Sequence, residues 1–329
     1  MASRIDFAQS VTSELHRITG GYFTYALECL GRSNGATVED AVHEFRKTTK
    51  KLRAVLRLVL SRAVRSDRRR WQQVLRNASA QLSPHRDFVV LEHNLRKAYE
   101  SLAPNLDLSL RPWADLSLLQ SVPQQQVGAL QESQLEAIRK ALTDAAGEVA
   151  ESTYLNVEAD VLLSGAVESY RRGRRQLRRM KAAPTAEALH ELRKRVKDQL
   201  YQLRLLANLS PKHLRPEAVD FTLLAELLGE FHDLAILKAA IDASRASFCC
   251  IVEQEGLSDW TAQRLAELER ESIRLARRLY TESPKARLSR FTAMHEAALC
   301  KLQEPIAEES DSPEEADLAG SSEGDSLFP

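Results

Sequence analysis

Apolar side chains recur at helical spacing along residues 42–60, and a line of cations runs beside them. In an α-helix, side chains three or four positions apart lie on the same face. The face that we expect to be buried consists of Val42, Phe45, Thr49, Leu52, Leu56 and Val59. The cationic line next to it consists of His43, Arg46, Lys50, Arg53 and Arg57. The pattern predicts an amphipathic helix with a row of positive charge beside its buried face.

The same pattern returns at residues 189–207. The positions that correspond to His43, Arg46 and Lys50 are His190, Arg193 and Lys197. The copies then diverge: where the first has Lys51, Leu52 and Arg53, the second has Asp198, Gln199 and Leu200. The second copy therefore offers less positive charge in that turn.

Helical spacing extends through most of the chain. Only 12 of the 329 residues are Gly and 11 are Pro, and the alternating runs that are typical of strands are few. We predict an all-α fold with further helices at residues 6–30, 66–82, 87–102, 124–151, 156–181, 217–255, 258–280 and 285–302. Thr37 and Thr185 are the expected N-caps of the two basic helices, because a threonine hydroxyl accepts a hydrogen bond from a first-turn N–H.

The two halves share more than their basic helices. The sequence HRD at 85–87 corresponds to HD at 232–233, at nearly the same distance from the first histidine of each basic helix. We predict two helical bundles related by an internal pseudo-twofold repeat, at residues 1–115 and 116–303. The boundary is placed in the proline-bearing stretch 104–123. This arrangement would allow the two basic helices to face each other.

Charge is unevenly distributed although the formal net charge is zero. Residues 304–329 carry nine acidic side chains and no basic one, so the rest of the chain has a formal charge of +9. A segment so poor in apolar residues cannot bury enough surface to fold, and we predict a disordered acidic tail. The body is expected to attract polyanions.

The remaining composition narrows the class of protein. The four cysteines lack the spacing of metal ligands, and the adjacent pair Cys249 and Cys250 is poorly suited to an ordinary disulfide, which favours a reducing compartment. No secretory leader is evident, and no apolar run approaches the roughly 18 residues of a membrane span. We expect a cytoplasmic protein with no cofactor, since the common nucleotide-binding and nucleophile motifs are missing from the sequence.

The chain resembles the CHAD domain family. The resemblance rests on H-x-x-R-x-x-x-K-K-L-R from His43, on H-x-x-R-x-x-x-K from His190, on YRRGRR at 170–175 and on the HRD and HD segments. It implies two helical bundles, a basic central surface or pore, and binding of inorganic polyphosphate without catalysis. We expect such a protein to localise to polyphosphate granules or to organise them.

The residue pattern itself fits this ligand. A linear chain of phosphates is matched by cations repeated along a helix, and arginine can direct two donors at phosphate oxygens. The segment 170–181, with seven basic residues, would lengthen the cationic track. The predicted polyphosphate-binding residues are His43, Arg46, Lys47, Lys50, Lys51, Arg53, Arg57, Arg171, Arg174, Arg175, Arg178, His190, Arg193, Lys194, Lys197 and Arg204.

Two other functions stay open at this point. The basic runs also fit a nucleic-acid-binding protein, for which nucleic acid would compete as a polyanion. A metal-dependent phosphohydrolase of the HD type would enlist His190, His232, Asp233 and Asp242. Arg86 stands in the first half where the second has His232, and a guanidinium cannot ligate a divalent metal. His43 and His190 fit a ligand contact and a packing role equally well, and the pattern does not indicate an oligomeric state.

Overall fold

A computed structural model describes the chain over residues 4–31, 38–59, 65–102, 132–180, 184–243 and 251–303. Within these ranges the regular structure consists of ten α-helices and one short 3-10 helix, without a strand. The prediction of an all-α fold is confirmed. None of the described helices combines the length and the apolar composition needed to cross a membrane.

The helices follow one another through the chain in this order. The first five are α1 (Val11–Gly31), α2 (Val38–Leu58), α3 (Arg65–Gln81), α4 (Ser83–Leu102) and α6 (Glu132–Glu151). They are followed by η2 (Thr153–Leu155), α7 (Ala159–Met180), α8 (Ala186–Leu205), α9 (Pro211–Ala243), α10 (Ile251–Leu279) and α11 (Pro284–Gln303). The basic helices predicted from sequence are α2 and α8.

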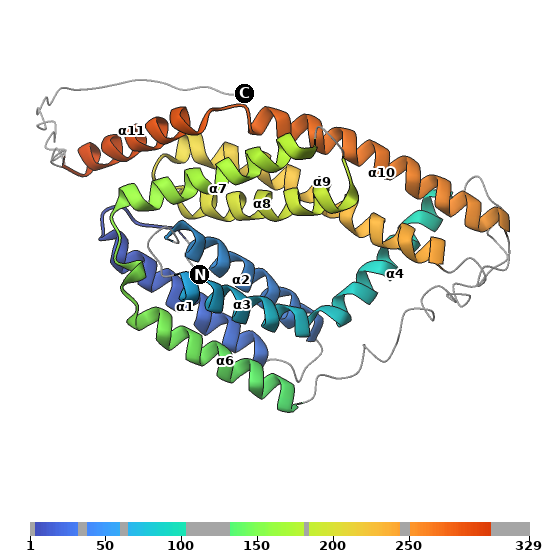
Figure 1. The fold of residues 1–329 in the computed structure, drawn as a ribbon, viewed down its shortest axis with the longest axis horizontal. Helices are drawn as coiled ribbons and strands as arrows, with labels where there is room; N and C mark the ends of the chain where they lie inside the picture. Colours follow the sequence, from blue (N-terminus) through green and yellow to red (C-terminus); the bar gives the residue numbers. More distant parts are fainter. Residues whose placement is uncertain are drawn as a thin grey trace, which may run out of the picture.

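The helices form two packed groups (Figure 1). Helices α1, α2, α3 and α6 pack together, and α7 to α11 form the second group, while α4 reaches from the first group to pack against α9 and α10. Helix α6 packs on α1 and α3, although the sequence-based division assigned its residues to the second bundle. The predicted boundary near residue 115, the cap Thr37 and the tail 304–329 lie outside the described residues.

Helix α2 lies between the two groups and contacts α1 and α3 on one side and α7 and α8 on the other. Every position of its predicted buried face is buried: Val42, Phe45, Thr49, Leu52, Leu56 and Val59. Three residues outside that face, Ala54, Val55 and Leu58, are buried as well. The second buried surface exists because helices of both groups pack against α2.

A glycine allows α7 to cross α2 closely. A Cβ atom at Gly165 would collide with the backbone of Leu58, near the end of α2. Only a residue without a side chain permits this approach, so Gly165 sets the distance between the two helices.

The starts of α8 and α9 follow from capping chemistry. The predicted cap of α8 is confirmed: the Thr185 hydroxyl accepts a hydrogen bond of 3.1 Å from the Ala188 N–H. Helix α9 begins at Pro211, six residues before its expected start near 217, because a proline at the first helical position loses no helical hydrogen bond. At its other end, residues 251–255 were predicted to finish this helix but form the start of α10.

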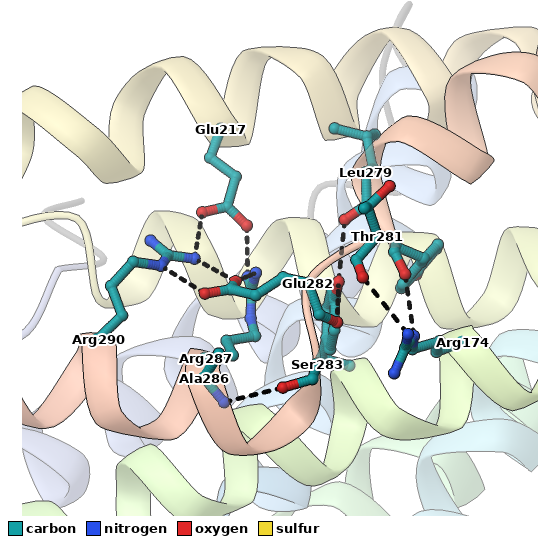
Figure 2. Close-up of polar contacts among 11 residues, drawn as sticks. Arg174, Glu217, Leu279, Thr281, Glu282, Ser283, Ala286, Arg287 and Arg290 are labelled. Carbon is teal, nitrogen blue, oxygen red and sulfur yellow. Dashed lines mark hydrogen bonds and ion pairs between the residues drawn. The ribbon is translucent and has the colours of Figure 1, made fainter.

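Helix α11 is fastened to the body by a buried arginine (Figure 2). The Arg287 side chain is 1% exposed and forms ion pairs with Glu217 of α9 and Glu282. Its guanidinium lies 4.1 Å from the ring centroid of Tyr170 on α7 and 5.0 Å from that of Phe291. Two carboxylates and two rings replace the water that a buried cation loses, so the network stabilises the docked helix.

Candidate functional site

The two basic helices line a common cavity of about 450 Å³, here called the first cavity. From α2 it receives Arg46, Lys50, Arg53 and Arg57, and from α8 it receives His190, Glu191, Arg193, Lys194, Arg195, Lys197, Asp198 and Tyr201. Helices α3, α4 and α9 complete the wall with Arg76, Val90, Leu91, His232, Asp233 and Ile236. Packing of α2 against α8 therefore brings together eight of the predicted binding residues from both copies.

Helix α3 orients the arginines of α2. Arg46 donates a hydrogen bond of 3.2 Å to the carbonyl oxygen of Ser79, and Arg53 donates one of 3.1 Å to the side-chain oxygen of Gln72. The Gln72 amide in turn donates to the carbonyl oxygen of Arg53 at 3.2 Å. Burial lowers the pKa of Arg53 to about 10, helped by the charge of Arg57 nearby, so Arg53 remains a cation at neutral pH. These contacts hold two positive charges at the cavity wall.

Asp198 joins the two copies through an ion pair with Arg57. Both side chains are largely buried, 16% and 10% exposed for Arg57 and Asp198. Burial raises the pKa of Asp198, and the positive charges of Arg57, Arg195 and Arg53 oppose that rise. The residue that interrupts the cationic pattern of the second copy thus neutralises a cation of the first. One turn of the track is occupied by a contact between the helices.

A histidine pair forms one end of the cavity wall. The Nδ1 atoms of His190 on α8 and His232 on α9 are 3.1 Å apart, and the ring centroids are 4.3 Å apart. Burial lowers the pKa of His190, and the nearby charges of Lys194 and Arg193 act in the same direction. His190 thus packs against His232 and also lines the first cavity, while its contact with a ligand stays a prediction. His43 does not line this cavity.

Besides His43, three predicted residues outside α7 do not line the first cavity. Lys47 forms an ion pair of 2.9 Å with Glu44. Lys194 does line the cavity, and it pairs with Glu191 there. Lys51 and Arg204 line a different cavity of about 600 Å³. Because Lys51 is one residue from Lys50, its side chain points about a quarter turn away and emerges on another side of the helix.

None of the arginines predicted on α7 lines the first cavity. Arg174 donates to the carbonyl oxygens of Tyr280 and Thr281, at 3.0 and 3.3 Å, beyond the end of α10 (Figure 2). Arg171 and Arg175 pair with Glu168, at 2.6 and 3.1 Å, and Arg178 is exposed. The predicted continuation of the phosphate track along α7 therefore lies outside the first cavity and stays a prediction.

The segment YRRGRR fastens a helix junction instead. The Tyr170 hydroxyl donates to the carbonyl oxygens of Leu279 and Glu282, both at 3.1 Å. Gly173 leaves room for the Tyr280 ring, where a Cβ atom would collide. Together with Arg174, these residues hold the α10–α11 junction against α7.

Several residues of the first cavity were not predicted. Arg76 lies on α3, on the face that also carries Gln72 and Ser79, and Arg195 lies on α8. The spacing of 72, 76 and 79 marks one face of a helix. That signal identifies a site residue only once α3 is known to pack on α2.

The ligand set of the phosphohydrolase alternative is only partly assembled. His190, His232 and Asp233 line the first cavity, but Asp242 does not. Asp242 instead binds the Lys238 ammonium with both carboxylate oxygens at 2.8 Å. In the described ranges no three metal-ligating side chains come together as a candidate metal site.

The fold and the cavity define an all-helical protein with a cation-lined site between two basic helices. Residues 25–242 match the CHAD domain, which is more than half of the chain. The chain therefore belongs to the CHAD domain family. The match runs from within α1 to the end of α9 and includes both basic helices. Comparison with curated proteins finds no match.

Proposed function

We propose that this protein binds inorganic polyphosphate in the first cavity and does not catalyse a reaction on it. The observation that carries this proposal is the meeting of the α2 and α8 cations in one cavity. A ligand of repeated negative charge can contact both helices at once. Membership of the CHAD domain family is compatible with a polyphosphate-related role.

The charge balance of the cavity favours a polyanion. Its cations are Arg46, Lys50, Arg53, Arg57, Arg76, Arg193, Lys194, Arg195 and Lys197, and its acids are Glu191, Asp198 and Asp233. Glu191 and Asp198 are already paired with Lys194 and Arg57. Cations therefore outnumber acids in the wall of the cavity, and this excess of positive charge increases the local concentration of anions.

Affinity for such a ligand comes from many contacts together. A hydrogen bond to a charged group contributes about 1.5–3 kcal/mol, so a short phosphate oligomer gains less than a long chain that reaches every cation. The cavity has a volume of about 450 Å³, and we propose that a single phosphate chain enters it while a nucleic-acid duplex stays outside. On this proposal polyphosphate is favoured over the nucleic-acid alternative. We propose that the protein uses this binding to localise to polyphosphate granules or to organise them.

The test is titration of the full chain with long-chain polyphosphate, triphosphate, single-stranded DNA and duplex DNA at several salt concentrations. We expect affinity to rise with phosphate chain length and to fall with salt, because bound cations are released from the ligand. Tighter binding of either nucleic acid would overturn the ligand assignment. Phosphate release that depends on added Mg²⁺ or Mn²⁺ would contradict the proposal that the protein does not catalyse a reaction.

Matched variants locate the site. Arg46→Gln with Lys50→Gln, or Arg193→Gln with Lys197→Gln, should weaken polyphosphate binding at least tenfold while the helical circular dichroism is unchanged. The control is Arg171→Gln with Arg178→Gln, which removes the same charge from the exposed face of α7. Equal weakening by the control would mean that polyphosphate binding depends only on the overall charge of the protein, which contradicts the proposed site.

A further inference from the structure

A second cavity of about 600 Å³ shares the Tyr201 side chain with the first. It lies between α1, α2, α8 and α9, and it is lined by Arg4, Tyr22, Lys51, Val55, Tyr201, Arg204, Ala207, Arg215, Ala218, Val219 and Thr222. Four of these residues are cations. In the part of the chain that the structure describes, no carboxylate lines it.

The contact between α2 and α8 differs in charge between the two cavities. The register that aligns His43 with His190 also aligns Lys51 with Asp198 and Arg57 with Arg204. In the first cavity, Arg57 of α2 contacts Asp198 of α8, and their opposite charges attract each other. In the second cavity Lys51 faces Arg204, and burial together with the charges of Lys47 and Arg204 lowers the pKa of Lys51. An anion bound here would relieve that repulsion.

The wall of the second cavity differs from that of the first in being largely apolar. Val55, Ala207, Ala218 and Val219 contribute aliphatic surface, and two tyrosines, Tyr22 and Tyr201, contribute rings. Inorganic polyphosphate, which is ionic along its whole length, gains nothing from such a wall and would lose water against it. The cations and the apolar surface together fit a ligand that carries both phosphate and an apolar body.

We propose that the second cavity binds an organic phosphate of nucleotide size, with its phosphates at Lys51 and Arg204 and its apolar body against the tyrosine and valine wall. The volume is within the usual range of small-molecule sites, about 300–1,000 Å³. Arg204 is already oriented, since it donates a hydrogen bond of 3.0 Å to the Thr222 hydroxyl. An aromatic base can pack on tyrosine while its phosphates meet the cations. The proposal goes beyond polyphosphate binding, because it concerns a different cavity and a different class of ligand.

The test uses ATP as the probe and inorganic triphosphate as its matched control, because both carry a triphosphate but only ATP has the apolar body. Calorimetric titration of the full chain is expected to give ATP at least tenfold tighter binding than triphosphate. Lys51→Gln with Arg204→Gln should weaken ATP binding at least tenfold and leave long-chain polyphosphate binding within about twofold. Val219→Asp, at a largely exposed position that tolerates the change, should also weaken ATP binding.

The variants of the first cavity separate this proposal from the proposed function. Arg46→Gln with Lys50→Gln should leave ATP binding unchanged. Lack of ATP binding, equal affinity for ATP and triphosphate, or loss of ATP binding in the first-cavity variant alone would each overturn the second site. Failure of polyphosphate to bind would overturn the proposed function and leave the ATP result intact.

Discussion

At the scale of single residues, Asp198 decides how the two basic helices meet. It occupies the position that corresponds to Lys51 in the first copy, and it forms a buried ion pair with Arg57 across the α2–α8 contact. Two cations at this point would repel each other in surroundings that screen charge poorly. The loss of one positive charge from the track therefore stabilises the contact that assembles the site.

Removing that carboxylate should destabilise the protein. Asp198→Asn leaves Arg57 buried without a counter-charge, and we expect a loss of roughly 3 kcal/mol in the free energy of unfolding, measured with chemical denaturant. The control is Asp242→Asn, which removes an exposed partner of Lys238 and should cost less than about 0.5 kcal/mol. Equal effects of the two changes would show that the buried pair has no special role.

The histidine pair predicts a pH dependence of stability. Burial lowers the pKa of His190 in the folded protein, so the unfolded chain binds a proton first as pH falls. The contribution of neutral His190 is present above the ordinary histidine pKa of about 6.5, and it is lost as pH falls from that value through the lower pKa of the folded protein. We expect the free energy of unfolding to drop between pH of about 7.5 and 5.5, a window above the ordinary titration of carboxylates.

Two variants test whether the histidine pair causes this drop in the free energy of unfolding. His190→Gln should remove part of the pH dependence in denaturant titrations at the two pH values. His213→Gln, at an exposed histidine near the start of α9, is the control for the exchange of histidine for glutamine. An unchanged slope in His190→Gln would contradict the assignment to this pair.

At the scale of helices, the YRRGRR motif packs one helix against the junction of two others. YRRGRR looks like a run of ligand-binding arginines, yet its tyrosine, its glycine and Arg174 hold the α10–α11 junction. The first cavity also depends on helix packing. The cations of α2 line it because α2 packs against α7 and α8.

The close crossing at Gly165 can be tested directly. Gly165→Ala places a methyl group against the Leu58 backbone, and we expect a loss of about 1–3 kcal/mol in the free energy of unfolding. Gly147→Ala is the matched control at an exposed position of α6, where a Cβ atom meets nothing within 4 Å. The control should stabilise the protein by about 0.5–1 kcal/mol, since alanine favours helix. A neutral or stabilising effect at Gly165 would show that α2 and α7 can move apart here at little cost in free energy.

At the scale of the whole molecule, a basic body is joined to an acidic segment. Residues 304–329, outside the described residues, carry nine acidic side chains beside a body of formal charge +9. We expect this segment to compete weakly with polyphosphate for the cationic surface. Deleting it should tighten polyphosphate binding at low salt and have little effect at high salt, where charges are screened. Identical affinities at low salt would reduce the segment to a solubility role.

The amino-acid sequence by itself determined the helices and the chemistry of their faces. Helical period and capping are local properties, so the buried face of α2, the Thr185 cap and the two basic helices could be predicted from residues a few positions apart. The start of α9 and the split between α9 and α10 were predicted less well, because Pro211 reads equally as a helix start or a loop residue. The family resemblance rested on the same local motifs.

Only the tertiary structure decided which of those charges act together. Lys50 and Lys51 are neighbours in sequence, yet they line different cavities. Arg57 finds its partner Asp198, and His190 finds His232, only when helices from distant parts of the chain pack. A cation on a helix face has the same local sequence whether it meets a carboxylate, a carbonyl or a ligand. Its role is set by the element packed against it, and that is a property of the folded chain.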